Sequence, residues 1–277
     1  MSDARYVDQP REVSIETLAL CNARCTFCPY PTLDRKGVQM SDEMVMRLLY
    51  QLSEFKYPFW FSPFKVNEPL LDPRLQLICE TFEKLCSRGR LRLFTNGSPL
   101  TTHHVQWIAR LKRVEHLWIS LNSTDPKEYQ TLMGISFEKT AKRLDDLHDG
   151  LIPHFPHPVV LSRVSTGDFV RDSEFRMQCF ERWPMFRCIV LKRDGWLGYV
   201  EPTNGVIPDT PCLRWFELSI LSTGVVSLCC MDGEGAHSIG DVNTQSLLEV
   251  YNAPHYRDRR LSIVSRRGFE PCRRCTY

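Results

Sequence analysis

The chain has 277 residues, of which 43% are hydrophobic, and this composition is typical of a globular protein with one full-sized core and a small appendage. Acids and bases are interspersed with a formal net charge of +2, which excludes the strong field that attracts nucleic acid; the expected partner is a small molecule. No run approaches the roughly 18 to 20 apolar residues of a membrane span, and no basic segment precedes an apolar one near the N-terminus, so we expect a cytoplasmic protein that does not bind membranes.

Short β-rich runs alternate with helical patterns along the first two thirds of the chain, and this alternation predicts parallel strands joined by helical crossovers. Six such units are fewer than the eight of a closed barrel, so the predicted fold class is α/β, a partial (β/α)6 TIM-like barrel over residues 1–194 with its site at the strand C-termini. The expected strands are Glu12 to Leu20, Phe59 to Lys65, Arg90 to Thr95, Glu115 to Leu121, Pro158 to Ser165 and Arg187 to Lys192. The expected helices are Ser41 to Leu52, Leu75 to Leu85, Thr101 to Leu111, Pro126 to Met133, Phe137 to Leu147 and Asp172 to Trp183.

From about Gly195 the pattern changes to a short, loop-rich segment with hairpin signals, and we expect a separate small domain over residues 195–277. The chain has twelve cysteines, and seven of them fall into two groups near its ends, which favours metal ligation over a disulfide framework. Four of the others are expected to be buried apolar residues, namely Cys79, Cys86, Cys179 and Cys188.

The first cysteine group follows the first expected strand and comprises Cys21, Cys25 and Cys28. Three thiolates cannot close a four-ligand site, so a 4Fe-4S cubane held by them keeps one iron open; a zinc ion completed by a distant histidine is the alternative. The spacing C-x3-C-x-aromatic-C resembles the signature of the radical S-adenosylmethionine (SAM) superfamily. The resemblance implies that the three cysteines hold a cluster that binds and cleaves SAM, that Phe27 lies beside the adenine, and that a flavodoxin or ferredoxin supplies electrons.

Polar residues at the ends of three further strands extend the resemblance. Val66-Asn67-Glu68-Pro69 is similar to the family's Gly-Gly-Glu-Pro segment, which implies that Asn67 and Glu68 bind SAM. Both glycines are replaced, and we expect Asn67 to take the place of one because Asn tolerates left-handed backbone. Thr95 and Asn96 match the family's ribose segment, and Ser120 and Asn122 offer short polar groups at the same rim; an ordinary turn is the alternative for Asn96-Gly97.

The second cysteine group comprises Cys212, Cys229, Cys272 and Cys275, with Gly224 five residues before Cys229. This segment resembles the short twitch form of the SPASM auxiliary domain, which implies a second 4Fe-4S cluster. Full ligation leaves no open iron, so that cluster is expected to move electrons, and structural zinc is the alternative. Cys229 and Cys230 are adjacent, and we choose Cys229 as the ligand because the twitch pattern places it five residues after the glycine.

The single-cluster arrangement resembles the superfamily's alcohol dehydrogenases, which implies oxidation of a polar small molecule such as a sugar, cyclitol or nucleoside. By the same resemblance Arg193 stabilises the developing alkoxide and Asp232 hydrogen-bonds the substrate, although a surface arginine is an equal alternative for Arg193. Three other readings stay open: a peptide maturase that crosslinks or epimerises residues, a redox-neutral epimerase or dehydratase, and a nonenzymatic iron-sulfur or zinc protein. Maturases commonly carry an extra N-terminal domain, for which the first cysteine at position 21 leaves no room.

Overall fold

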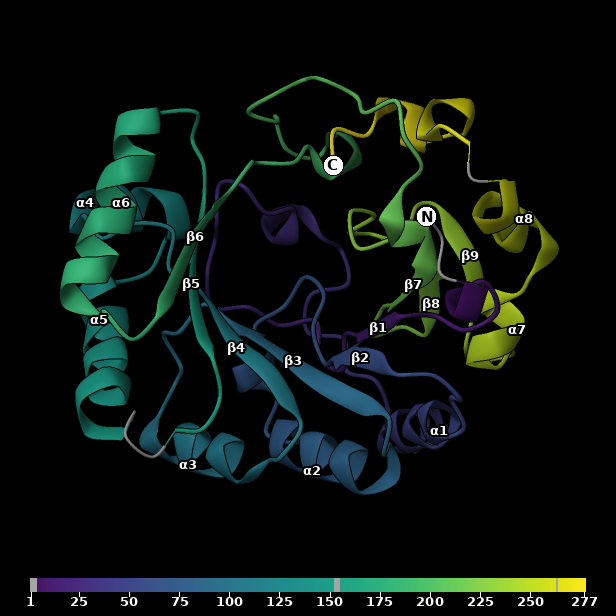
Figure 1. Ribbon diagram of the computed structural model, residues 1–277, viewed down its shortest axis with the longest axis horizontal. Coiled ribbons are helices and arrows are strands. Elements are labelled where there is room, and N and C mark those ends of the chain that lie inside the picture. The colour runs from purple at the N-terminus through teal and green to yellow at the C-terminus, as the bar shows by residue number, and fades with distance from the viewer. Residues whose placement is uncertain (1–3, 152–154, 263) are drawn as a thin grey trace.

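A computed structural model describes residues 4–151, 155–262 and 264–277. Within these residues one sheet has the strand order β6-β5-β4-β3-β2-β1-β7-β8-β9. Strands β1 to β6 are parallel neighbours, and Figure 1 shows them curving round a central space with helices α1 to α6 on the outside. The predicted partial barrel is therefore confirmed. The strands are Glu12–Ile15 (β1), Phe59–Ser62 (β2), Gly89–Thr95 (β3), Val114–Ser120 (β4), Val159–Val164 (β5) and Arg187–Leu191 (β6).

The main core lies between the sheet and the outer helices. Each strand sends apolar side chains outward to this layer, for example Val13 and Phe61, which are fully buried. The helices begin and end where their capping residues allow: Ser41 accepts from the Met44 amide at the start of α1, and Gly134 closes α4 in the left-handed conformation. The helices are Asp42–Ser53 (α1), Leu75–Leu85 (α2), Thr102–Arg110 (α3), Pro126–Met133 (α4), Phe137–Asp145 (α5) and Phe169–Arg182 (α6).

β1 and β2 are shorter than the sequence pattern predicts by three residues or more, whereas the other strands end within one residue of the prediction. β2 ends before Pro63, because proline lacks the amide hydrogen that a central strand needs. β1 ends at Ile15, and the next residue, Glu16, instead forms a buried ion pair with Arg35 at 2.7 Å. The chain thus leaves both strands early and forms the loops that surround the central space.

The C-terminal segment extends the same sheet. β7 (Glu217–Ile220) pairs in parallel with β1, and β8 (Val225–Ser227) and β9 (Ser238–Asp241) follow in antiparallel order. Helices α7 (Leu247–Tyr251) and α8 (Pro254–Ser262) complete this unit, and the last residues of the chain return toward the opening of the barrel (Figure 1). No helix in the described part of the chain has the length and apolar character needed to span a membrane.

Candidate active site

A cavity of ≈ 700 Å³ lies inside the partial barrel. Its volume is within the range of ligand-binding pockets in proteins, about 300 to 1,000 Å³. The wall combines the first cysteine group, the polar strand-end residues and side chains from the C-terminal segment. Its lining includes Cys21, Cys25, Phe27, Cys28, Asn67, Glu68, Thr95, Asn96 and Ser120, all expected site residues, together with Met231, Arg214 and Tyr277 from the C-terminal segment.

The loop with the first three cysteines is anchored on the C-terminal end of α4. The amides of Arg24 and Thr26 donate to the carbonyls of Met133 and Leu132, each at 2.9 Å, so the end of the helix holds the loop in place. Burial raises the pKa of the Cys21 thiol to about 11 and that of Cys28 to about 12. The thiols are therefore protonated in the free chain, and iron binding must release their protons.

Glu68 joins the segment after β2 to the end of β3. Its carboxylate accepts from the Thr95 hydroxyl at 2.8 Å and from the Asn96 amide at 2.6 Å, and burial raises its pKa to about 7. Asn96 in turn donates from its side chain to Asn22 at 2.8 Å, within the cysteine loop. This network ties the cysteine loop to two strand-end segments, and Asn22 is a participant that the sequence analysis missed although it lies between two of the cysteines.

Asn67 lies on the cavity wall, but its backbone differs from the expectation. It is not among the residues with positive φ in the described chain; those other than glycine are Asn122, Trp196 and Leu197. The Asn67 side-chain oxygen instead accepts from the Lys65 amide at 2.9 Å, and its buried side-chain nitrogen has no partner among the described residues. An unpartnered donor on this wall can bind a ligand that carries oxygen acceptors, such as the carboxylate group of SAM.

Ser120 and Asn122 occupy different positions relative to the cavity. Ser120 lines the cavity, whereas Asn122 is fully buried behind it at a φ of 66°. The Asn122 side chain accepts from the Val164 amide at 2.8 Å and contacts the Met133 sulfur. Its amide is thus used to join β4, β5 and α4, and this arrangement does not support the predicted contact with SAM.

Arg193 was expected at the cavity, but its two neighbours Lys192 and Asp194 line it instead. The backbone of Arg193 pairs with Thr203 in both directions, at 3.1 and 3.2 Å, which holds this residue against the following loop. Lys192 and Asp194 form an ion pair at 3.3 Å, and burial raises the pKa of Asp194. The charged side chains that line the cavity at the end of β6 are therefore those of Lys192 and Asp194, and the role of Arg193 stays a prediction.

The cavity is also lined by an ion pair and by a group of aromatic side chains, neither of which the sequence indicated. Glu12 on β1 and Arg92 on β3 form an ion pair at 2.7 Å. The Phe94 ring stacks on the Phe64 ring, with centroids 4.9 Å apart, and its centroid is 5.8 Å from that of the Trp118 ring. Such a surface can hold the face of a ring, while the charged pair can bind its polar substituents.

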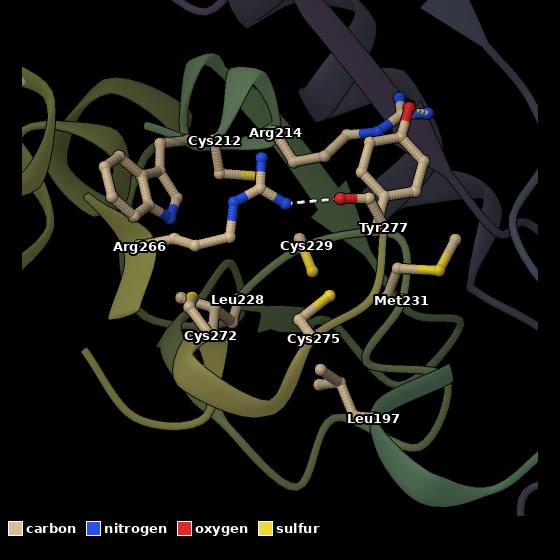
Figure 2. A pocket seen from close by; sticks show the side chains of 11 residues that line it. Leu197, Cys212, Arg214, Leu228, Cys229, Met231, Arg266, Cys272, Cys275 and Tyr277 are labelled. Carbon is tan, nitrogen blue, oxygen red and sulfur yellow. Dashed lines mark hydrogen bonds between the residues drawn. The ribbon is translucent and has the colours of Figure 1, made fainter. Parts of the chain in front are cut away.

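The second cysteine group surrounds a separate small hollow beside the central cavity. Figure 2 shows Cys212, Cys229, Cys272 and Cys275 on its walls, with Arg266 and Arg214 close by. Cys230 does not line this hollow. Four thiols around one hollow are a donor set suited to a fully ligated cubane. In the described residues no three His, Cys, Asp or Glu side chains form a group that would hold a single metal ion.

Asp232 is not among the residues that line the central cavity. It lines a different pocket with Tyr199 and His237, and its carboxylate accepts from the His237 amide at 3.0 Å. The backbone amide of Asp232 donates to the Cys229 carbonyl at 3.1 Å, so the residue closes the turn after this cysteine. This placement does not support the predicted hydrogen bond between Asp232 and a substrate in the barrel.

Comparison with known protein families identifies the families to which the two cysteine-containing segments are similar. Residues 15–174, more than half of the chain, match the radical SAM superfamily, and residues 212–276 match the SPASM iron-sulfur cluster-binding domain. The chain belongs to the radical SAM superfamily. It is therefore an enzyme, and its cofactors are SAM and iron-sulfur clusters. The two matched segments lie on either side of residue 194, and the domain boundary there stays a prediction.

One curated relative is the S-adenosyl-L-methionine-dependent 2-deoxy-scyllo-inosamine dehydrogenase of Niallia circulans, which is 29% identical over 100 residues. The match covers 36% of this chain and 40% of that relative. Among solved structures, BtrN in complex with AdoMet and 2-DOIA has a TM-score of 0.68 at 15% identity and aligns over 96% of this chain and 93% of its own. SuiB of Streptococcus suis bound to its precursor peptide SuiA has a TM-score of 0.72 at 15% identity, over 97% and 70% of the two chains. At these identities the structural likeness concerns the fold alone.

Proposed function

We propose that this enzyme oxidises an alcohol of a polar small molecule, such as a sugar, cyclitol or nucleoside-like compound, to a ketone. One observation carries the proposal: Arg214, Met231 and Tyr277 line both the central cavity and the four-cysteine hollow. A substrate in the barrel would therefore be separated from an auxiliary cluster by a single layer of side chains. This arrangement suits the passage of an electron from the substrate to that cluster.

The proposed reaction balances with one SAM per product. Cys21, Cys25 and Cys28 would hold the cluster whose reductive cleavage of SAM would supply the radical that removes a hydrogen atom from the carbinol carbon. The hydroxyl would lose a proton, and a cluster held by the four C-terminal cysteines would accept the remaining electron. A flavodoxin or ferredoxin is the proposed donor of the electron that cleaves SAM, and the cytoplasm is the proposed location. The match to the Niallia circulans dehydrogenase supports this reaction class, although it covers only part of both chains.

Asp194 is the proposed acceptor of the hydroxyl proton, in place of a role for Arg193. Its carboxylate lines the cavity and has a raised pKa because it is largely buried, so it can hold a proton more readily than an exposed aspartate. Lys192 at 3.3 Å can stabilise the carboxylate before the transfer. An arginine is a poor proton acceptor because its pKa exceeds about 12.

The decisive test uses a substrate labelled with deuterium at the carbinol carbon and a Cys272→Ala variant. Wild-type enzyme should transfer deuterium into 5′-deoxyadenosine and release one ketone per SAM. Cys272→Ala, which keeps the first cluster, should still cleave SAM but form no ketone. Undiminished ketone from this variant would refute the electron-acceptor role of the cluster, and a redox-neutral product from the wild type would favour an epimerase or dehydratase.

The proton acceptor is tested by Asp194→Asn beside Arg193→Ala. Asp194→Asn should retain both clusters and slow ketone formation by about 10²-fold or more, because a positioned proton acceptor contributes about that much. Arg193→Ala should change the rate little.

The structural likeness to SuiB makes a peptide maturase the second candidate, and deuterium transfer from a peptide rather than from an alcohol would establish it.

A further inference from the structure

Lys65 is a buried cation in the segment after β2, and it reaches across to the C-terminal unit. Its side chain is almost fully buried, with 3% of the residue exposed. The ammonium donates to the Ser227 hydroxyl at 2.8 Å and to the carbonyls of Asp232 and Cys229 at 2.9 and 3.2 Å. All three acceptors are neutral, and no ion pair to Lys65 is found among the residues that the structure describes.

Other buried cations of the barrel are neutralised by carboxylates. Arg35 binds Glu16 through two contacts, at 2.7 and 2.9 Å. Arg163 is held by Glu128 at 2.8 Å and Asp172 at 2.9 Å. A buried ammonium without a counter-charge is costly, by several kcal/mol even after the protein relaxes around it. Lys65 has no carboxylate within ion-pair distance among the described residues. The negative charges that act on it from farther away belong first to Cys230 and Cys229 and then to Glu16 and Asp232, so an anion held by cysteines is the main candidate for its counter-charge.

The four-cysteine hollow is where such an anion would lie. Two of the carbonyls that Lys65 binds belong to Cys229 and to the turn that follows it, so the ammonium fixes the segment that carries a proposed ligand. Arg266 lines the same hollow, is 6% exposed and donates to backbone oxygens of Thr210, Pro211 and Tyr277. Figure 2 shows its guanidinium among the cysteines. A third buried cation with carbonyl partners, Arg260, lies 3.6 Å from the Tyr251 ring, which offsets its charge.

We propose that Lys65 is the counter-charge of an auxiliary iron-sulfur cluster held by the four cysteines and raises the reduction potential of that cluster. The inference rests on the proposed function, which places a cubane there. A cubane with four thiolate ligands is anionic, and reduction adds one more negative charge. A cation fixed beside it favours the reduced form, since charge and hydrogen bonding tune cluster potentials. Lys65 also lines the central cavity, so the same ammonium contacts the proposed substrate site and the Cys229 segment.

The experiment isolates the auxiliary cluster by replacing Cys21, Cys25 and Cys28 with alanine in every sample. The protein reconstituted with iron and sulfide is titrated with reductant. Electron paramagnetic resonance measures the reduced fraction of the cluster at each potential and so gives the reduction potential of the cluster. Lys65→Met should raise the oxidised-to-reduced ratio at a fixed potential at least tenfold, which for one electron is 59 mV. In Lys65→Arg this ratio should stay within threefold of the parent value. Lys142→Met removes an exposed lysine on α5 and is the control for the loss of a positive charge elsewhere on the protein.

Each outcome decides the role of Lys65. A Lys65→Met sample with about four irons and an unchanged potential would overturn the proposal and leave Lys65 as a structural anchor. If Lys65→Met loses iron, the neutral donor variant Lys65→Gln answers the same question. Loss of iron from both neutral variants but not from Lys65→Arg would support the counter-charge, and loss from all three would contradict it. A parent protein that binds no iron at the four cysteines would instead refute the proposed function itself.

Discussion

Cys229 and Cys230 are adjacent thiols with different surroundings. Cys229 lines the hollow with the other three cysteines, whereas Cys230 does not. Burial raises the pKa of Cys230 to about 11, and the Arg214 guanidinium opposes this rise. Both residues follow the end of β8 at Ser227, in a turn, and this turn places only Cys229 on the wall of the hollow.

Replacing each of these cysteines with alanine should therefore give different iron contents. Cys229→Ala should reduce the iron bound by reconstituted protein from about eight to about four per chain, because one of two cubanes loses a ligand. Cys230→Ala should retain about eight and serves as the matched control. Iron and sulfide analysis measures both, and loss of four irons from Cys230→Ala alone would show that the ligand is the second of the pair.

His116 on β4 is a neutral imidazole in the cavity wall. Its ring contacts Phe94 and Trp118, with centroids 5.7 and 5.4 Å away, and its Nε2 is buried without a partner among the described residues. Burial, assisted by the Arg92 charge, lowers the pKa of His116 to about 4. In the unfolded chain the value is about 6.5, so protons bind the unfolded state more strongly.

The stability that His116 contributes is thus complete above pH 6.5 and is lost as the pH falls through 4. His116→Phe, which keeps the ring contacts, should remove this dependence. The free energy of unfolding of the cluster-free chain should fall by about 2 to 3 kcal/mol more in the wild type than in the variant between pH 7 and pH 4. Urea unfolding at the two pH values measures the difference, and parallel losses would show that His116 is not the group responsible.

The turn after β3 shows how one short segment positions several site residues. Gly97 has a φ of 80°, and a Cβ atom there would lie 2.9 Å from the Ile119 side chain. The residues on either side, Asn96 and Ser98, are hydrogen-bonded to each other and to Asn22 in the cysteine loop. The backbone conformation that glycine permits therefore fixes the contact between β3 and the loop that carries the first cluster.

Gly97→Ala should destabilise the protein by about 1 to 2 kcal/mol and weaken SAM binding, because both strain and the contact with Ile119 push the turn outward. Thermal unfolding and equilibrium dialysis with SAM measure the two effects. Gly268→Ala is the control, since a Cβ atom there meets nothing within 4 Å. Unchanged affinity for SAM in Gly97→Ala would mean that this turn does not shape the cofactor site.

The sequence predicted the barrel and the cluster loops because their signals are local. Helical periodicity and strand composition repeat within ten to fifteen residues, and the three cysteines of the first group lie within eight. The ion pair that lines the cavity could not be predicted in the same way, since Glu12 and Arg92 are 80 positions apart and meet only when β1 and β3 enclose the cavity. The hydrogen bond from the Arg193 amide to the Thr203 hydroxyl is likewise a contact that no local pattern indicates.

The two parts of the molecule share one sheet and several side-chain contacts. Leu218 and Ile220 of β7 are buried beside Val13 and Ile15 of β1. Beyond the sheet, Arg11 forms an ion pair with Glu217 at 2.8 Å, and the Tyr251 hydroxyl donates to the Tyr6 carbonyl at 2.7 Å. The C-terminal unit thus covers the edge of β1, which would otherwise expose unpaired backbone groups and apolar side chains.

A chain truncated to residues 1–194 should therefore not fold to a stable barrel. Removal of β7 exposes the β1 edge and leaves Arg11 without its carboxylate, so the fragment should aggregate or unfold at a temperature well below that of the full chain. The full-length protein should unfold in one transition by circular dichroism and tryptophan fluorescence. A soluble fragment with the same melting temperature, or two separate transitions in the full chain, would show that the two segments are independent units.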